Sequence, residues 1–250
     1  MQYHLDTIPV WDALRLGGPC PLCAMHFKEE RLEVERTLGG AVMEPDERIR
    51  VNRTGFCQAH HQQLAAMSNK LGHSLLMDSH TLEILPKLEA AQKSIGSGGK
   101  AGLFRPAAGG GLDKAIALLE ETSRGCIICD ELSVHMARYL YTFTQLWKKD
   151  AKFRAEWEQS QGVCLPHAAE LLRAAQQHLN AADQAEFAAS VLSLTRKALD
   201  TDEQDLKWFT LKFDYRNQDK PWGNSKNALE RTVNRLRGWC LGDEPVPKEK

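Results

Sequence analysis

Eight cysteine and histidine residues form the most informative pattern in the chain, because they build the same motif twice. The first copy consists of Cys20, Cys23, Cys57 and His60, and the second of Cys126, Cys129, Cys164 and His167. Each copy is a C-x2-C pair followed by a C-x2-H pair, with 33 intervening residues in the first copy and 34 in the second. Three thiolates and one imidazole are a ligand set of closed tetrahedral zinc sites. The sequence therefore predicts two metal centres, one in each copy.

The spacing also predicts how the ligands are held. Two intervening residues let a C-x2-C turn curl around one ion, and residues i and i+3 share a face in the first turn of a helix. We expect Cys23 and Cys129 each to open one helix, and Cys57 and Cys164 each to open the next. Each ion would then clamp two helix N-termini, whose dipoles favour thiolate over thiol.

The ligand types do not by themselves identify the metal. Two zinc ions in structural sites are the first expectation, because four protein ligands leave no position for a substrate. Two iron–sulfur clusters are the alternative, since thiolates also select such clusters. A free dithiol pair is a third possibility, although it normally sits in a βαβ context that is missing here. Disulfides would leave the matching positions of His60 and His167 unexplained.

Helical periodicity dominates the regions that carry these motifs, so the predicted class is all-α. One apolar stripe runs from Leu64 to about Ala91, and further helices are expected over 165–179, with Asn180 as the N-cap of the next. The segment from Ser94 to Gly111 holds seven glycines and reads as a linker. The predicted division is a first metal-binding repeat (1–93), a linker (94–111), a second repeat with a helical extension (112–240) and a disordered tail (241–250).

Length and charge narrow the function classes. The chain has 250 residues and a formal net charge of −1 at pH 7, so no overall basic character favours nucleic acid. The start of the chain lacks the pattern of a secretory signal, and no apolar run approaches a membrane span. We therefore expect a cytoplasmic protein in which thiols stay reduced.

Several residues outside the motifs could carry chemistry. Asp78 falls on the apolar stripe between His73 and His80, and His135 lies near a core face. A second polar site is one interpretation; a paired carboxylate and hydrogen-bonded histidines are the simpler one.

The C-terminal section holds one more candidate. The segment 207–222 interleaves five aromatic residues with lysine and arginine, which could stack bases, but packing within the domain is the simpler interpretation. Cys240 has no sequence partner and is expected to be incidental.

The chain resembles a known family in several short runs. These are Thr7–Val10, Cys20–Cys23, Met43–Asp46, Gly55–Cys57 with His60, Gly162–His167, Trp208–Arg216 and Pro221–Gly223. They are similar to an uncharacterised bacterial family, found mostly in anaerobic Firmicutes and catalogued as a domain of unknown function. The resemblance implies a bacterial, cytoplasmic context and supports the eight ligands, and it implies no activity.

The predicted function is that of a metal-binding helical interaction or scaffold protein, with a protein partner or a second copy of itself. An iron–sulfur redox or sensing protein is the alternative, with its site at a cluster or between the lobes, near Asp78, His80 and the run 214–216. No separate catalytic set emerges from the sequence, which favours a protein that is not an enzyme.

Overall fold

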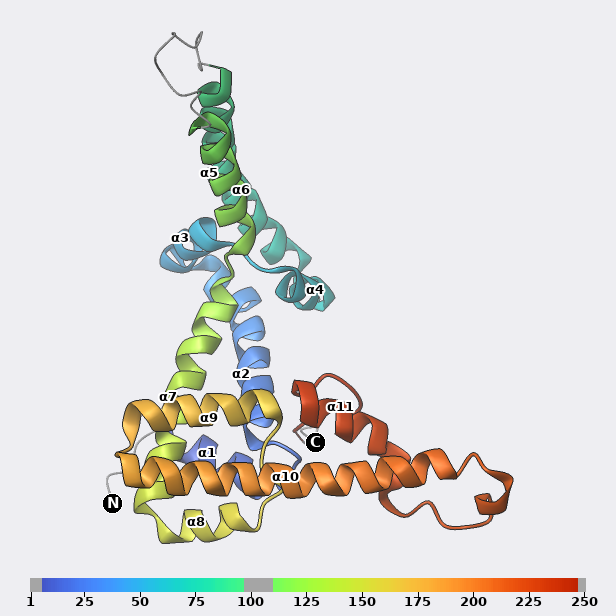
Figure 1. Cartoon of the computed structure of the whole chain (residues 1–250). Helices are drawn as coiled ribbons and strands as arrows, with labels where there is room; N and C mark the ends of the chain where they lie inside the picture. Colours follow the sequence, from blue (N-terminus) through green and yellow to red (C-terminus); the bar gives the residue numbers. More distant parts are fainter. Residues whose placement is uncertain (1–5, 97–109, 247–250) are drawn as a thin grey trace, which may run out of the picture. The chain divides into compact units, whose positions relative to one another are not determined.

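The structure is a computed structural model that describes residues 6–96 and 110–246 (Figure 1). Within these ranges the chain forms eleven α-helices and three short 3-10 helices, and no strand. The predicted all-α class is confirmed. No helix in the described ranges is both long and apolar enough to cross a bilayer.

The chain divides into two compact units. Unit 1 combines Met1–Glu29 with Val134–Lys250, and unit 2 is Glu30–Ser133. The units do not coincide with the predicted repeats at 1–93 and 112–240. Two long helices, α2 (Pro21–Leu38) and α7 (Ile127–Lys149), each begin in one unit and end in the other. Each unit is therefore built from both halves of the sequence.

Unit 1 has a large aromatic core. Its other helices are α1 (Thr7–Arg15), α8 (Ala151–Glu158), α9 (Leu165–His178), α10 (Ala181–Leu211), η2 (Tyr215–Asn217), η3 (Gly223–Asn227) and α11 (Ala228–Arg237). Phe143 of α7 meets Phe153 and Trp157 of α8 edge to face, and Trp147 meets Phe187 of α10 in the same way. All five rings are almost fully buried. Such burial of large rings supplies much of a domain's stability.

Unit 2 has a smaller core. Its other helices are η1 (Gly40–Met43), α3 (Pro45–Thr54), α4 (Gln58–Ala66), α5 (Lys70–Gly96) and α6 (Gly110–Arg124). The core joins Leu38 of α2, Leu64 of α4, Leu76 of α5 and Ile128 of α7, with Phe56 from the loop before α4. Helix α5 packs on α3 and on α6.

The apolar stripe after Cys57 does not form one helix. It breaks between α4 and α5, where the Asn69 side chain accepts a hydrogen bond from the Gly72 amide at 2.8 Å and donates one to the Leu38 carbonyl at 2.6 Å. Asparagine satisfies free amides at the start of a helix and so favours a restart there. The Asn180 cap is confirmed, because its side chain accepts from the Asp183 amide at 3.0 Å.

Two predicted segments lie partly outside the described residues. Of the linker 94–111, residues 97–109 are not described, and its ends belong to α5 and α6. Of the tail 241–250, residues 247–250 are not described, but the start of the tail is held in place. The Asn234 side chain bonds both the amide and the carbonyl of Leu241, and the Trp239 indole donates to the Asp243 carbonyl.

Candidate metal centres

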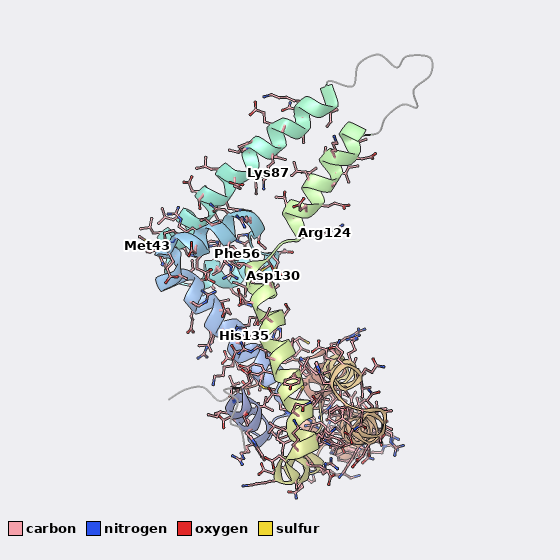
Figure 2. All side chains as sticks on the ribbon, turned by 90° about the vertical axis from the view of Figure 1, so that its left-hand side faces the viewer. Met43, Phe56, Lys87, Arg124, Asp130 and His135 are labelled. Carbon is pink, nitrogen blue, oxygen red and sulfur yellow. The ribbon has the colours of Figure 1, made fainter. Side chains whose placement is uncertain are left out.

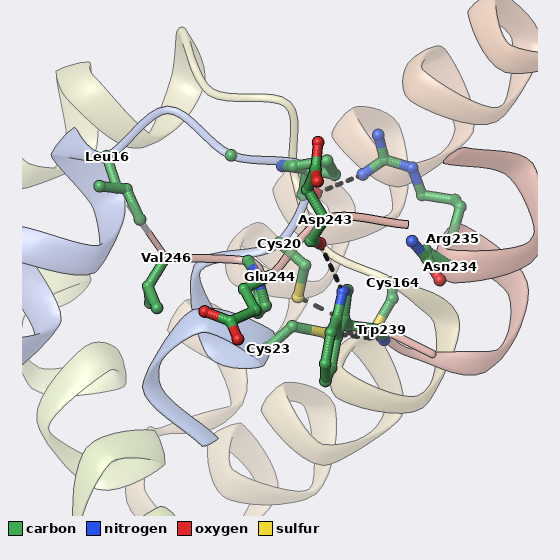
Figure 3. A pocket seen from close by; sticks show the side chains of 13 residues that line it. Leu16, Cys20, Cys23, Cys164, Asn234, Arg235, Trp239, Asp243, Glu244 and Val246 are labelled. Atoms are coloured by element: carbon green, nitrogen blue, oxygen red, sulfur yellow. Dashed lines mark hydrogen bonds between the residues drawn. The ribbon is translucent and has the colours of Figure 1, made fainter. Parts of the chain in front are cut away.

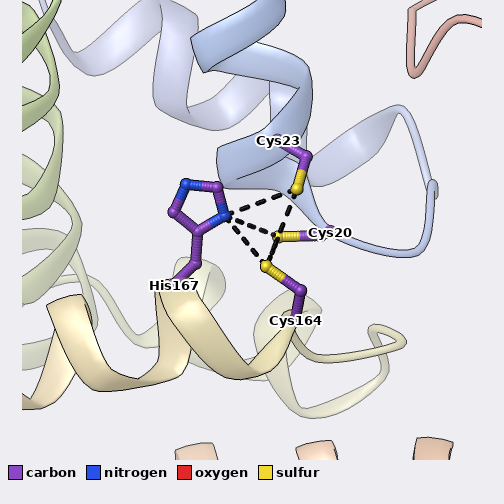
Figure 4. Close-up of side chains that lie close together, drawn as sticks. All are labelled: Cys20, Cys23, Cys164 and His167. Carbon is purple, nitrogen blue, oxygen red and sulfur yellow. Dashed lines mark hydrogen bonds between the residues drawn. The ribbon is translucent and has the colours of Figure 1, made fainter. Parts of the chain in front are cut away.

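One group of four ligand side chains, called centre A, lies in unit 1. It consists of Cys20, Cys23, Cys164 and His167, and all four are buried. The sulfurs of Cys20 and Cys23 each lie 3.7 Å from that of Cys164. His167 turns its Nδ1 atom toward all three sulfurs, at 3.1 to 3.5 Å (Figure 4).

A second group, called centre B, lies in unit 2. It consists of Cys57, His60, Cys126 and Cys129. The sulfurs of Cys57 and Cys129 are 3.8 Å apart, and His60 Nδ1 lies 3.1 to 3.5 Å from the three sulfurs. All eight predicted residues are thus brought together in two sets with the predicted composition.

The pairing differs from the prediction. We expected the C-x2-C and C-x2-H pairs of one sequence copy to share an ion, and this is wrong. Centre A takes Cys20 and Cys23 from the first copy and Cys164 and His167 from the second, while centre B makes the reverse exchange. Each C-x2-C or C-x2-H pair is called a half-motif, and the two copies therefore exchange half-motifs.

The length of the intervening helices gives the physical reason for the exchange. Helix α2 starts at the first C-x2-C pair and has 18 residues, and α7 starts at the second pair and has 23. At about 1.5 Å per residue these helices are roughly 27 and 35 Å long, and each carries the chain away from its own C-x2-C pair. Each C-x2-H pair then meets the C-x2-C pair of the other copy.

The two helices that carry the C-x2-H pairs begin with the same backbone geometry. Cys57 is the N-cap of α4 with φ −75° and ψ 167°, and Cys164 is the N-cap of α9 with φ −70° and ψ 161°. Gly55 and Gly162, each two residues earlier, have φ of 69° and 71°, which favours glycine. A Cβ on Gly55 would also come within 2.8 Å of the His80 ring. The duplication is therefore retained in local structure, although the ligands are exchanged.

In centre B a backbone hydrogen bond joins the two half-motifs. The amide of Ile127, inside the C-x2-C turn, donates to the Gly55 carbonyl at 3.1 Å. Gly125 permits this close approach, because a Cβ there would lie 2.3 Å from the Thr54 carbonyl oxygen. The residue of centre A that corresponds to Ile127 is Pro21, which has no N–H to donate.

In centre A a buried arginine joins the half-motifs instead. Arg235 of α11 donates to the Pro19 carbonyl at 2.5 Å and to the Gln161 carbonyl at 2.9 Å, one on each ligand-bearing loop. Its Nε atom pairs with Asp202 of α10 at 3.2 Å, and both side chains are almost fully buried. The helical extension therefore supplies the link that Pro21 cannot make. The contrast between Pro21 and Ile127 is the only sequence signal for this role.

The centres differ in their access to solvent. Cys129 of centre B is exposed and Cys57 is half-buried, whereas the four ligands of centre A are between 1% and 8% exposed. Centre A borders a cavity of about 570 Å³, onto which Cys20, Cys23 and Cys164 face (Figure 3). Its other walls come from the loop before Cys20, from α11 and from the following segment up to Val246.

The C-terminal segment also contacts a ligand of centre A. The backbone amide of Trp239 donates to the Cys23 sulfur at 3.4 Å, and its ring meets Phe27 of α2 edge to face. An N–H donor of this kind stabilises a metal-bound thiolate and fixes its orientation.

The outer nitrogens of the two histidines have different partners. His60 Nε2 lies 3.1 Å from the Glu30 carboxylate, which also accepts from the Gln63 side chain at 2.9 Å. A carboxylate in this position orients a ligating imidazole. In centre A the Glu170 carboxylate lies 3.9 Å from His167 Nε2, too far for a hydrogen bond. Glu30 had no signal in the motif spacing.

Proton affinities at the two centres reflect close packing of sulfur and imidazole. Burial disfavours a charged His60, but hydrogen bonds with Cys126 and Glu30 raise the pKa of its imidazole to about 10. Burial likewise disfavours a charged Cys126, yet the bond with His60 lowers its pKa to about 6. In centre A burial opposes the charge on His167, and its three cysteine neighbours raise its pKa overall. In both centres the surrounding cysteines therefore stabilise a positive charge on the histidine. A bound metal ion would displace the protons and supply this positive charge itself.

The residues proposed for a second polar site do not assemble into one. Asp78 is exposed, so its predicted burial is wrong. His80 bonds the Asn52 carbonyl at 2.8 Å, and His73 lies 3.1 Å from His61. His135 contacts Glu29 in unit 1 at 3.0 Å. Each described histidine of this set has its own local partner, as in the simpler interpretation.

The aromatic and basic segment 207–222 packs largely on itself. The Lys212 ammonium donates to the carbonyls of Asn217, Gln218 and Lys220 at 2.5 to 2.7 Å, and Trp208 donates to Pro221 at 3.1 Å. Arg216 pairs with Asp214 at 2.5 Å. These contacts close the loop between α10 and α11, which fits packing better than base stacking.

The donor sets fit a single tetrahedral ion. With Zn–S bonds of about 2.3 Å, two sulfurs on one tetrahedral zinc lie roughly 3.8 Å apart. The sulfur pairs at 3.7 to 3.8 Å match this spacing in both centres. Each Cys3His group can therefore hold one metal ion with every coordination position filled by protein.

Comparison with known proteins places the chain in a family. No curated protein and no solved structure matches it significantly. Residues 1–243 match the family described as a family of unknown function (DUF6062), which extends through both centres and α11. The chain belongs to this family.

Proposed function

We propose that the protein holds two structural zinc ions and serves as a non-catalytic interaction protein. The observation that carries the zinc assignment is the spacing of sulfurs at 3.7 to 3.8 Å in both centres, with four protein ligands in each. Structural zinc sites are closed in this way, whereas catalytic ones keep a position for water or substrate.

The same spacing argues against iron–sulfur clusters. In a 4Fe–4S cluster each ligand binds a different iron, and in a 2Fe–2S cluster only two ligands share an iron, so the four ligand atoms do not all lie close together; here all four lie within 4.8 Å of one another in each centre. The sulfurs here are already at the separation for a shared ion. A single iron would fit these dimensions as well, and the experiment below separates it from zinc.

The test is anaerobic purification of the full chain, followed by elemental analysis and absorption spectroscopy. We expect a colourless protein with two zinc ions per chain and no sulfide. Iron with sulfide and a band near about 400 nm would replace the proposal with a cluster protein. Iron without sulfide would replace it with mononuclear iron centres. Cys164→Ser should retain one zinc ion, because only centre A loses a ligand.

An interaction role follows from what the metal would do. Each ion would fix two segments that are distant in sequence, and such an ion contributes its binding free energy to folding. The eight ligands would thus build a rigid support for surfaces elsewhere on the chain. We propose that those surfaces bind a protein partner or a second copy of the chain.

A further inference from the structure

The two centres have the same ligand set but differ in how far solvent reaches their sulfurs. In centre B, Cys129 is exposed and Cys57 is half-buried, and their sulfur atoms lie 3.8 Å apart. The corresponding cysteines of centre A, Cys23 and Cys164, have almost the same spacing at 3.7 Å but are only 7% and 1% exposed. Solvent-accessible cysteines that stand next to a second cysteine are typical sites of oxidation. Of the two centres, centre B therefore offers the better target to a small oxidant.

The C-terminal segment gives centre A further protection. The backbone amide of Trp239 donates a hydrogen bond to the Cys23 sulfur at 3.4 Å. A thiolate stabilised in this way is a weaker nucleophile, because nucleophilicity falls as basicity falls. The same segment forms one wall of the cavity beside centre A. Cys23, which holds the position in centre A that Cys129 holds in centre B, is therefore the less reactive of the two.

Contacts that need no metal hold the two accessible cysteines of centre B beside each other. The Ile127 amide donates to the Gly55 carbonyl at 3.1 Å, and each of these residues stands two positions before one of the cysteines. Phe56, which directly precedes Cys57 and is labelled in Figure 2, shares the core of unit 2 with Ile127. The two sulfurs therefore stay neighbours even when no ion joins them.

We propose that Cys57 and Cys129 form an oxidative modification site, which hydrogen peroxide converts into a disulfide. The exposed Cys129 thiolate attacks the O–O bond and becomes a sulfenic acid, and hydroxide leaves. The Cys57 thiolate then attacks the sulfenic sulfur, the S–S bond forms, and a second hydroxide leaves. The two thiolates together lose two electrons, the peroxide gains them, and two protons from solvent turn both hydroxides into water.

The disulfide takes over the mechanical role of the ion. Oxidation removes two of the four ligands of centre B and leaves only His60 and Cys126, so the centre loses its ion. The new bond joins the start of α4 to the first turn of α7, which are the two segments that the ion joins. A thiol reductant reverses the step by exchange. The proposal rests on the zinc assignment and adds a regulatory property to it, the release of one of two ions in response to peroxide.

The experiment treats the full, zinc-loaded chain with one equivalent of hydrogen peroxide and maps the disulfides by mass spectrometry. The chain carries Cys240→Ser, because Cys240 is exposed and could link two copies. Trypsin leaves Cys57 on the peptide 54–70, and it leaves Cys126 and Cys129 together on the peptide 125–138. A cross-link between these peptides, assigned to Cys129 by fragmentation, is the expected product.

Zinc release is measured on the same samples with a chromogenic chelator. We expect one ion to be released for each disulfide formed, and centre A to react at least about tenfold more slowly. Addition of thiol reductant and zinc should restore two ions per chain.

Two matched variants separate the exposed sulfur from the buried one. Cys129→His leaves a Cys2His2 set, which also holds structural zinc, but removes the sulfur that peroxide attacks. It should form no cross-link and release its ion at least about tenfold more slowly. Cys126→His makes the same ligand exchange at the buried position and should still form the cross-link. Zinc content and helicity before treatment show that both variants are folded, and mapping of the Cys240→Ser chain decides the question if either is not.

Three results would overturn the proposal. They are a disulfide confined to the peptide 125–138, a cross-link that persists in Cys129→His, and equal rates of oxidation at both centres. The two readouts keep this test apart from the zinc assignment. A chain with two zinc ions and no cross-link refutes only the modification site, and the expected cross-link in a chain with another metal refutes only the zinc assignment.

Discussion

Cys20 and Cys164 are separated by 144 positions in the chain, yet their sulfurs lie 3.7 Å apart in centre A. The relationship is reciprocal, because Cys57 and Cys129 meet in the same way in centre B. Neither half of the sequence contains a complete centre. The two candidate metal centres therefore each join residues of both sequence copies, and neither centre lies within one copy.

The exchange predicts the behaviour of separate halves. Residues 1–96 and 110–250, expressed alone, should each bind zinc weakly and show reduced helicity, since their half-motifs stand at opposite ends of α2 or α7. Mixed in the presence of zinc, they should form a one-to-one complex that contains two ions. Isothermal titration and circular dichroism check this. Full helicity and one tightly bound zinc in each isolated half would contradict the exchange.

Whether a feature of the fold or of the centres could be predicted depended on how close together its residues lie in the sequence. The eight ligands, the N-cap positions of Cys57 and Cys164 and the all-α class follow from spacing within a few residues. The partner of each half-motif does not, because two copies with equal spacing are consistent with either pairing. Only the uninterrupted helices that follow Cys23 and Cys129 argue for exchange. The role of Arg235 could not be predicted, because Arg235 lies far in the sequence from the two ligand-bearing loops that it joins. It takes the place of a backbone hydrogen bond that Pro21 cannot donate.

Loss of Arg235 should weaken centre A selectively. Arg235→Met removes the bridge between the Pro19 and Gln161 carbonyls and a buried partner of Asp202, so we expect a loss of about 3 kcal/mol in unfolding free energy. Zinc affinity should fall at centre A and stay unchanged at centre B.

Arg231→Met is the control for the Arg235 variant. It also removes an ion pair with Asp202, but Arg231 otherwise bonds Asp205, Asn224 and Asn227, none of which belongs to a ligand-bearing loop. It should lower stability and leave zinc affinity intact. Equal loss of zinc in both variants would show that Arg235 acts only through general stability.

Removal of Glu30 should affect the other centre. Glu30→Ala frees His60 Nε2 from its carboxylate partner, and zinc affinity at centre B should drop about 10- to 100-fold. Competition with a chelator, using the Cys164→Ser background, measures this directly. Glu170→Ala, made in the Cys126→Ser background, should change centre A by no more than about twofold, because that carboxylate lies beyond hydrogen-bond distance.

The order of metal loss should follow burial. A thiol reagent or chelator should empty centre B first, at least about tenfold faster than centre A, because Cys129 is exposed and local opening is cheapest there. The single-centre variants Cys126→Ser and Cys164→Ser assign the two phases. Ending the chain before Trp239 removes the amide bond to Cys23 and one wall of the cavity, and should speed loss from centre A alone.

The exchange of half-motifs also sets an order for biosynthesis. Centre B has all its ligands once Cys129 has left the ribosome, whereas centre A must wait until His167 has followed. At a synthesis rate of roughly 5–20 residues per second, the thiols of Cys20 and Cys23 wait about 7–30 s on the nascent chain before Cys164 and His167 are made. If the centres bind metal as proposed, the more buried of the two is therefore the one whose cysteines wait longest for their ion during synthesis, and these thiols must stay reduced for that interval.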